Sequence, residues 1–155
     1  MWGHGSAAEI KRPLRLAAGY GQTPPPPPAV EDGRRRQAGK SILIEGYASL
    51  FGVEDLAGDV VRAGAFTRSL ARGGEVAMLF QHASGRRAGS WTVLREDGRG
   101  LFVRGLVTDE TPAGRAALKL MADGSVDGLS IGFIARDWSP RVGGGRELRE
   151  VELRE

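Results

Sequence analysis

The sequence GLSIGF, residues 128–133, places a serine between two glycines at the junction of two expected elements. Before it, residues 112–123 have the pattern of a helix, which Gly124 can end. After it, the alternating apolar residues of 131–138 predict a strand. Glycines on both sides of Ser130 leave room for another backbone segment to approach closely. Ser130 is therefore the best candidate for a nucleophile in this sequence.

Short strands are expected on both sides of this junction. Residues 41–51 alternate between two apolar faces, which predicts a strand. The other expected elements are strands at 60–61, 76–82 and 146–155, a hairpin of 91–95 with 101–107, and a short helix at 64–72. Mostly antiparallel short strands with two short helices predict an α+β fold built on a small closed or nearly closed β-barrel.

Length and composition set the class of protein. A chain of 155 residues allows one domain with a tail. The apolar stretches are too short to cross a bilayer, so we expect no transmembrane helix. Residues 1–19 lack the long apolar core of a secretory signal, so we expect no such signal. The sequence has no cysteine, which excludes disulfides and thiol catalysis. With no cysteine and two histidines, we expect no metal site and no other cofactor.

The positive charge is concentrated at the N-terminus. Residues 1–41 hold seven Lys/Arg and three Asp/Glu, whereas residues 42–155 hold fifteen and sixteen. Five consecutive prolines at 24–28 and three arginines at 34–36 lie in this basic stretch. Such a composition predicts a disordered basic, proline-rich arm over residues 1–40, followed by a domain over 41–155. An arm that docks on an acidic partner or on nucleic acid is the alternative.

The domain contains one histidine, His82, because His4 belongs to the arm. A lone histidine on the apolar face of a strand is usually a hydrogen-bonded core residue. A serine hydroxyl, however, is a weak nucleophile until a base takes its proton, and imidazole has a suitable pKa. A third group must then hold the orientation and tautomer of the imidazole. His82 is therefore the candidate general base for Ser130.

The pattern Gly-x-Ser-x-Gly also occurs in the nucleophile elbow of α/β-hydrolases. That elbow lies between a strand and a following helix, and the catalytic histidine comes later in the chain. Here a helix is expected before Ser130 and a strand after it, and the sequence has no histidine beyond it. The order of elements and residues therefore argues against an α/β-hydrolase.

Several ordered blocks carry a family resemblance. They are EGYASLF at 45–51, GDVV at 58–61, GAF at 64–66, MLFQH at 78–82 and DGLSIGF at 127–133. Together they resemble the prohead (capsid maturation) serine proteases of tailed bacteriophages, over residues 42–155. That family is related in fold to the herpesvirus assemblin proteases. The resemblance implies a herpesvirus-protease-like fold and a serine endopeptidase with Ser130 as nucleophile and His82 as general base.

The third member of the triad is expected in the acidic segment at the end of the chain. Herpesvirus relatives use a second histidine, which this domain lacks, so a carboxylate must replace it. Strand alternation places Glu155 on the same face as the apolar residues Val151 and Leu153, and Glu150 on the other face. We therefore choose Glu155 over Glu150 as the group that orients His82. The alternative, in which Glu150 and Glu155 are both solvated charges at the edge of the sheet, has about the same weight as an orienting role.

The resemblance also implies partners and a location. The substrates would be the scaffolding segment of the major capsid protein and the protease itself, with a homodimer left open. The enzyme would act in the bacterial host cytoplasm, inside the assembling procapsid of a phage, a prophage or a gene transfer agent. Because the charge of residues 42–155 is near neutral, we expect no nucleic-acid partner, and we expect no membrane partner.

One departure from the family pattern leaves a second function open. Members continue past the acidic segment with an apolar strand and a proline-containing turn, whereas this sequence ends at Glu155. We therefore expect a domain that is truncated at its C-terminus. The alternative to a protease is a catalytically incomplete, non-enzymatic capsid assembly protein.

Overall fold

The computed structural model describes residues 39–155, and the structural statements below concern that part of the chain. Its elements are β1 (Ser41–Leu50), β2 (Val60–Val61), α1 (Thr67–Arg72), β3 (Met78–Leu79), β4 (Arg87–Glu96), β5 (Gly100–Thr108), α2 (Pro112–Ala122), β6 (Phe133–Pro140) and β7 (Arg146–Leu153). The expected arm over residues 1–40 lies almost wholly outside the described residues. Its disorder stays a prediction.

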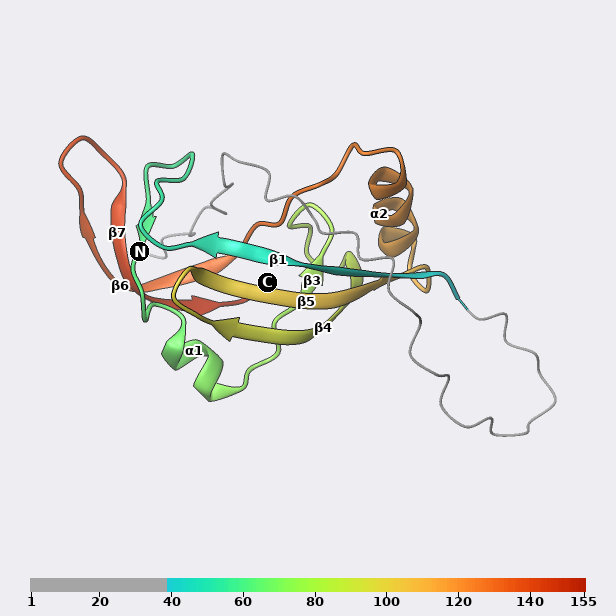
Figure 1. Ribbon diagram of the computed structural model, residues 1–155, viewed down its shortest axis with the longest axis horizontal. Helices are drawn as coiled ribbons and strands as arrows, with labels where there is room; N and C mark the ends of the chain where they lie inside the picture. The colour runs from blue at the N-terminus through green and yellow to red at the C-terminus, as the bar shows by residue number, and fades with distance from the viewer. Residues whose placement is uncertain (1–38) are drawn as a thin grey trace.

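The strands form two sheets. One is antiparallel, in the order β1-β5-β4-β3, and the other has the order β2-β7-β6, with β2 parallel to β7. Figure 1 shows the first sheet along the length of the domain, with α2 at one end and β6 and β7 at the other. The mostly antiparallel α+β arrangement is confirmed. Of the expected closed or nearly closed barrel, the closed form is wrong, because the described strands form two separate sheets and β1 and β3 are the unjoined edges of the first.

Backbone hydrogen bonds explain why the sheets do not join at β7. Beyond β2, the C-terminal half of β7 faces α1 and the loop before it. Val151 donates its N–H to the carbonyl of Ala65, and Leu153 donates its N–H to Oγ of Ser69 in α1, at 3.0 and 2.9 Å. These contacts satisfy donors that another strand would otherwise use. The ladder therefore ends there, and no further strand continues it among the described residues.

The hairpin of β4 and β5 supplies the central wall of the domain. Its register pairs Trp91 with Gly105, close to the predicted boundaries. On β5 the residues Leu101, Val103 and Val107 are at most 3% exposed, as expected for alternate positions on one buried face. The predicted hairpin is confirmed.

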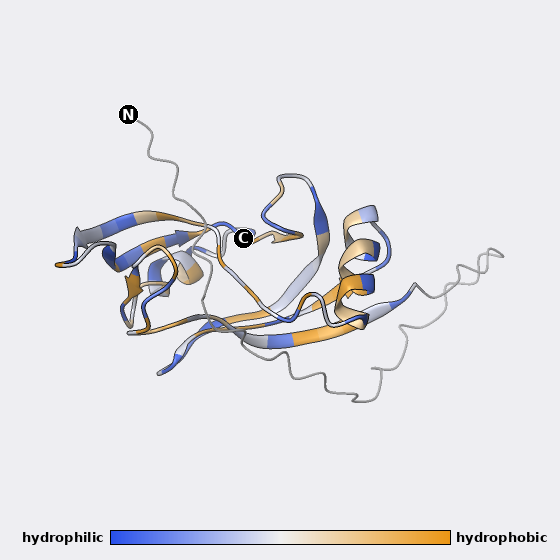
Figure 2. Cartoon of the chain, turned by 90° about the horizontal axis from the view of Figure 1, so that it is seen from above, coloured by the Kyte–Doolittle hydropathy of each residue, from blue (hydrophilic) through white to orange (hydrophobic). Residues whose placement is uncertain are grey.

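Two hydrophobic clusters lie on the described part of the fold. The first lies between the two sheets and α1 and includes Phe66, Leu101 and Leu148, each 0% exposed. The second lies between the four-stranded sheet and α2. Figure 2 shows hydrophobic stretches on the strand that runs beneath α2. Burial of each large apolar side chain contributes about 1.5–3 kcal/mol, so these clusters hold the sheets and helices together.

Local signals fix both ends of α2, and the end at Gly124 is the one that the sequence predicts. At the start, the hydroxyl of Thr111 accepts a hydrogen bond from the N–H of Gly114, at 2.9 Å. At the end, Gly124 has a φ of 75°, and Ser125 donates its N–H to the carbonyl of Leu120 at 2.9 Å. This is a Schellman ending, for which glycine is favoured. It turns the chain away from α2 toward Ser130.

A buried ion pair fastens the start of β7. The carboxylate of Asp59 is 2% exposed and accepts hydrogen bonds from the backbone N–H of Arg146, at 2.7 Å, and from its guanidinium. Asp59 also raises the pKa of Arg146 further above its ordinary value. Asp59 thus has a structural role beside β2, as expected for a residue next to a turn.

Neither helix between residues 39 and 155 is both long and apolar enough to span a lipid bilayer.

Candidate active site

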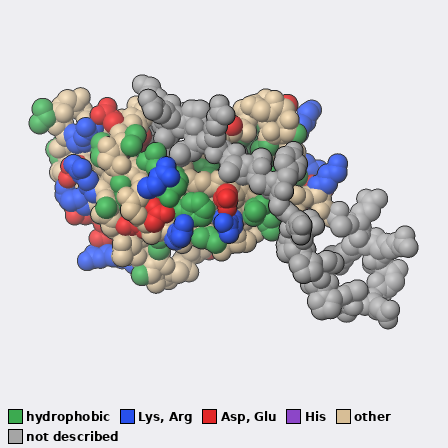
Figure 3. All heavy atoms as spheres, viewed as in Figure 1, with side chains coloured by type: hydrophobic (Ala, Val, Ile, Leu, Met, Phe, Trp, Pro, Cys, Tyr) green, Lys and Arg blue, Asp and Glu red, His purple; other side chains and the backbone are tan. Residues whose placement is uncertain are grey.

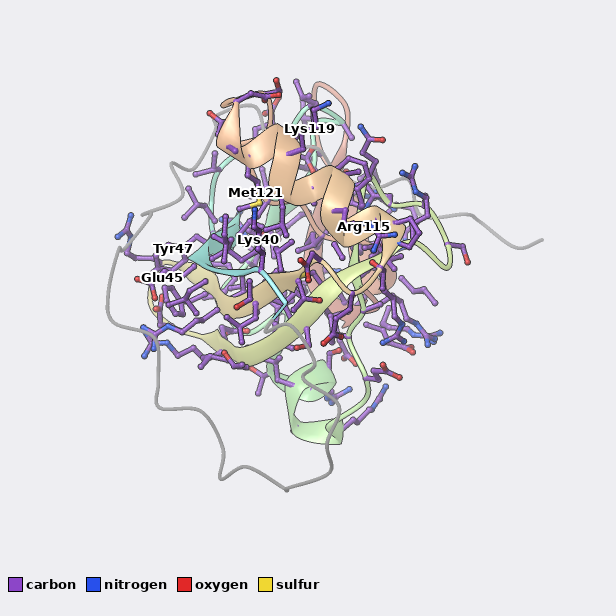
Figure 4. The ribbon with its side chains drawn as sticks, turned by 90° about the vertical axis from the view of Figure 1, so that its right-hand side faces the viewer. Lys40, Glu45, Tyr47, Arg115, Lys119 and Met121 are labelled. Atoms are coloured by element: carbon purple, nitrogen blue, oxygen red, sulfur yellow. The ribbon has the colours of Figure 1, made fainter. Side chains whose placement is uncertain are left out.

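A cavity of about 810 Å³ lies between the four-stranded sheet, α2 and the segment 125–130. The three residues chosen from the sequence, His82, Ser130 and Glu155, all line it. Figure 4 shows Met121, another lining residue, on the side of α2 turned toward β1, and Lys119 on the other side of the helix. The fold therefore brings together three residues from three distant parts of the sequence.

His82 lies in a turn and not in a strand, and of the expected strand 76–82 only Met78–Leu79 is confirmed. The chain reverses at Phe80, and Ala83 donates its N–H back to the carbonyl of Phe80 at 3.3 Å. Gln81 and His82 both have left-handed backbone conformations, with φ of 55° and 54°. An extended strand needs negative φ, so the positive φ of Gln81 and His82 ends the strand and forms a turn.

The left-handed conformation of His82 has an energetic consequence. Each non-glycine residue held there costs about 1–3 kcal/mol, and such strain gathers at functional sites. Histidine tolerates the region better than most residues do. The turn leaves the imidazole 35% exposed and at the wall of the cavity, where a strand would have directed it toward the apolar face.

Glu155 is the carboxylate that meets His82. Its Oε1 lies 3.3 Å from Nδ1 of the imidazole, and its side chain is 18% exposed. When Nδ1 carries the proton and donates it to the carboxylate, Nε2 is left with a lone pair that can accept a proton. The predicted face is confirmed for Val151 and Leu153, which are 1% and 5% exposed. The catalytic role of Glu155 stays a prediction.

Glu150, the alternative carboxylate, is engaged elsewhere. Its Oε2 accepts a hydrogen bond from the guanidinium of Arg68 at 2.8 Å. Strict alternation also fails along β7, because Leu148 is 0% exposed although it was expected on the same face as Glu150. The pairing of β6 with β7 shifts register on both sides of Asp137, and the step from Glu150 to Leu148 places an extra residue in β7, so Leu148 and Val151 share one core cluster.

Arginines neutralise the other carboxylates of β7. Arg62 holds the pKa of Glu147 below its ordinary value, and Arg136 does the same for Glu152. Figure 3 shows basic and acidic side chains interspersed over the face seen there. Glu155 differs from these residues because its partner is the imidazole of His82.

Ser130 is half-buried and comes three residues before β6, which begins at Phe133. The strand expected from residue 131 thus begins two residues later. Backbone hydrogen bonds connect the segment of Ser130 to the segments of Glu155 and His82. Gly132 donates its N–H to the carbonyl of Glu155 at 3.0 Å and accepts from the N–H of Arg154 at 2.9 Å. Arg154 in turn accepts from the N–H of Ala77, at 3.0 Å, on the segment that leads to His82.

Gly132 has a positioning role that the sequence indicated only in general terms. A Cβ built on Gly132 would lie 2.7 Å from Cδ of Glu155 and closer still to its Cγ and Oε1. The expected close approach is therefore real at Gly132, where both the backbone and the side chain of Glu155 come near. A Cβ on Gly128 would meet nothing within 4 Å, so there the expectation is wrong. The absent side chain of Gly132 leaves the carboxylate of Glu155 its place beside His82.

We expect Gly132→Ala to fold but to lose about 100-fold in the rate of substrate cleavage, since displacement of a catalytic group by about 1 Å can have that effect. The added methyl group meets Cγ, Cδ and Oε1 of Glu155, so the side chain of Glu155 has to leave its place beside His82. Steady-state cleavage with thermal melting measures both effects, and kcat should fall more than KM changes. Gly128→Ala is the matched control. Equal rates for the two variants would contradict this role.

The described residues contain no group of three or more His, Cys, Asp or Glu side chains placed to hold a metal ion. What they hold is a hydroxyl, an imidazole and a carboxylate that line one cavity, with the imidazole and the carboxylate in contact. Such a set suits proton transfer to and from a serine nucleophile.

Comparison with known proteins gives the family. Residues 31–155 match the family model described as caudovirus prohead serine protease. The chain belongs to this family. The prohead-protease match covers the whole candidate site, from His82 to Glu155.

A curated relative agrees with this family. This prohead-protease chain is similar to the prohead protease of Enterobacteria phage HK97, with 41% identity over 122 residues. The alignment covers 76% of this chain and 54% of the phage protein, so the chain spans about half the length of that relative. No solved structure matches the chain. The expected likeness to the herpesvirus protease fold therefore stays a prediction.

Proposed function

We propose that this chain is a serine endopeptidase that cleaves the scaffolding segment of the major capsid protein, and itself, during procapsid maturation. The observation that carries the proposal is the contact of His82 Nδ1 with Glu155 Oε1 on the wall of the cavity that Ser130 also lines. Membership of the prohead serine protease family and the name of the phage relative support the same reaction.

In the proposed reaction, Oγ of Ser130 attacks the carbonyl carbon of the scissile peptide bond while Nε2 of His82 takes the hydroxyl proton. The tetrahedral intermediate collapses, the C–N bond breaks, and His82 returns the proton to the leaving amine. A water molecule then attacks the acyl-enzyme, again with His82 as base, and frees Ser130. Glu155 holds the Nδ1–H tautomer and stabilises the imidazolium that forms in each step.

The place and partners follow from the proposed substrate. The enzyme acts inside the assembling procapsid, in the cytoplasm of the bacterial host, where capsid protein and protease are enclosed together. Such confinement supplies a high local concentration of substrate, so tight binding is not required for turnover. A homodimer is not required by this scheme, since one chain supplies His82, Ser130 and Glu155.

A small fluorophosphonate tests the proposal directly, because it modifies serines that a neighbouring base activates. We expect stoichiometric labelling of Ser130, read by mass spectrometry of the digested full chain. Prior treatment should block cleavage of co-expressed capsid protein that carries its scaffolding segment. Labelling that spreads over several serines, or cleavage that survives complete labelling of Ser130, would contradict the proposal and favour a non-enzymatic assembly protein.

A further inference from the structure

The cavity extends well beyond the three proposed catalytic residues. Much of its wall is apolar and comes from both the sheet and α2, through Ile44, Met78, Ala88, Trp91, Val107 and Ala117. A volume of about 810 Å³ is within the range of sites that enclose a ligand of several hundred daltons. The catalytic chemistry alone needs only a carbonyl group beside Ser130, so the rest of this space calls for another occupant.

The apolar wall is firmly held. Ile44, Met78, Ala88 and Val107 from the sheet are between 3% and 5% exposed, and all belong to the hydrophobic cluster packed under α2. Ala117, from the helix, is 5% exposed and belongs to the same cluster. A cavity bounded by packed core residues keeps its shape, and a preformed apolar site favours a ligand that fits it without rearrangement.

Two of these wall residues are alanines, one from the sheet and one from the helix packed on it. Ala88 lies on β4 and Ala117 on α2, and both line the same cavity. Ala88 and Ala117 are 4% and 5% exposed and otherwise packed in the cluster under α2, so a larger side chain at either position that keeps the fold would have to extend into the cavity. These two alanines therefore set the room available to a bound side chain.

The charges on the wall favour an apolar occupant. Of the described residues that line the cavity, the ionisable ones are His82, Asp127 and Glu155, and none is a lysine or arginine. A carboxylate side chain in the cavity would find no cation there to replace its hydration. For a lysine side chain, Glu155 is already engaged by His82 and Asp127 is exposed to water, so the apolar wall would leave its ammonium group without a buried partner.

We propose that this cavity binds an apolar side chain of the peptide substrate next to the scissile bond, against the apolar wall that the β4–β5 face and α2 form. The inference rests on the proposed endopeptidase function, and it names the substrate class: cleavage sites flanked by an aliphatic or methionine side chain. Ala88 and Ala117 determine the size that is accepted. Burial of such a side chain is expected to tighten binding by about 10- to 100-fold.

Peptide binding tests this without catalysis. The full chain carrying Ser130→Ala, which leaves peptides uncut, is titrated with acetyl-Ala-Ala-X-Ala-Ala-amide peptides, where X is Leu, Met, Asp or Lys. Such peptides can shift in register, so the one large side chain is free to find the cavity. We expect the Leu and Met peptides to bind at least about 10-fold more tightly than the Asp and Lys peptides. The indole signal of Trp91, a wall residue, should shift on NMR titration.

Larger side chains on the cavity wall test whether the peptide preference arises in this cavity. Ala117→Leu, and separately Ala88→Leu, should remove the advantage of the Leu and Met peptides, with thermal melting used to confirm that each variant is folded. Equal affinities for all four peptides, no binding, or a preference that persists in both folded variants would overturn the proposal. The fluorophosphonate experiment distinguishes failure of this proposal from failure of the proposed function. If Ser130 is labelled but the peptides bind equally, only the apolar binding site is contradicted. If the peptides show the preference but Ser130 is not labelled, only the endopeptidase function is contradicted.

Discussion

Ser130→Ala is expected to lower the rate of capsid-protein cleavage by at least about 10⁴-fold, because the substitution removes the atom that forms the acyl-enzyme. Alanine differs from serine by one hydroxyl, and Ser130 is only half-buried, so the fold should remain. Single-turnover cleavage of capsid protein that carries its scaffolding segment measures the rate. A thermal melt of the same preparation separates loss of chemistry from loss of structure.

Ser125→Ala is the matched control for this variant. Ser125 also lines the cavity, but it follows the end of α2 and contacts Asp123. Its replacement should leave the cleavage rate close to that of the unmodified chain.

Adding His82→Ala to Ser130→Ala should lower the cleavage rate little further, since the members of a triad act as a unit. Substantial cleavage by Ser130→Ala would rule it out as the nucleophile.

Glu155→Gln is expected to reduce kcat by about 10³- to 10⁴-fold, with a much smaller change in KM. Glutamine keeps the shape of the side chain, but it removes the charge that stabilises the imidazolium of His82. Its amide can also donate to Nδ1 and so favour the wrong tautomer. The contact to be broken is the one between Oε1 of Glu155 and Nδ1 of His82, at 3.3 Å.

Glu150→Gln is the matched control, because it makes the same chemical change on the same acidic segment. Glu150 pairs with the exposed side chain of Arg68, and exposed pairs of this kind contribute at most about 1 kcal/mol to stability. Its kcat should therefore stay within a few-fold of the unmodified value. If the two glutamine variants lose activity equally, Glu155 is not the orienting group. If Glu150→Gln loses more, that role belongs to Glu150.

The elements that the sequence predicted well are those governed by local rules. The α2 helix, from its Thr111 cap to the left-handed Gly124, and the hairpin of β4 and β5 depend on neighbours a few residues away. The strand expected over 76–82 failed for the opposite reason. Its apolar alternation favours an extended chain, but the turn at Gln81 and His82 is held by the surrounding structure against local preference.

The sequence by itself determined which residues could do the chemistry. The domain has one histidine and one glycine-flanked serine, and alternation in the last strand favoured Glu155 over Glu150. These inferences need only residue types, their scarcity and a period of two.

Only the tertiary structure decided that these residues meet. His82 and Glu155 are 73 positions apart, and hydrogen bonds from Ala77 to Arg154 and between Gly132 and Glu155 bring their segments together. The space for the carboxylate over Gly132, and the open extent of the sheet, likewise depend on which segments lie side by side. Local periodicity carries no information on such distant pairings, because they are selected by packing and hydrogen bonding over the whole fold.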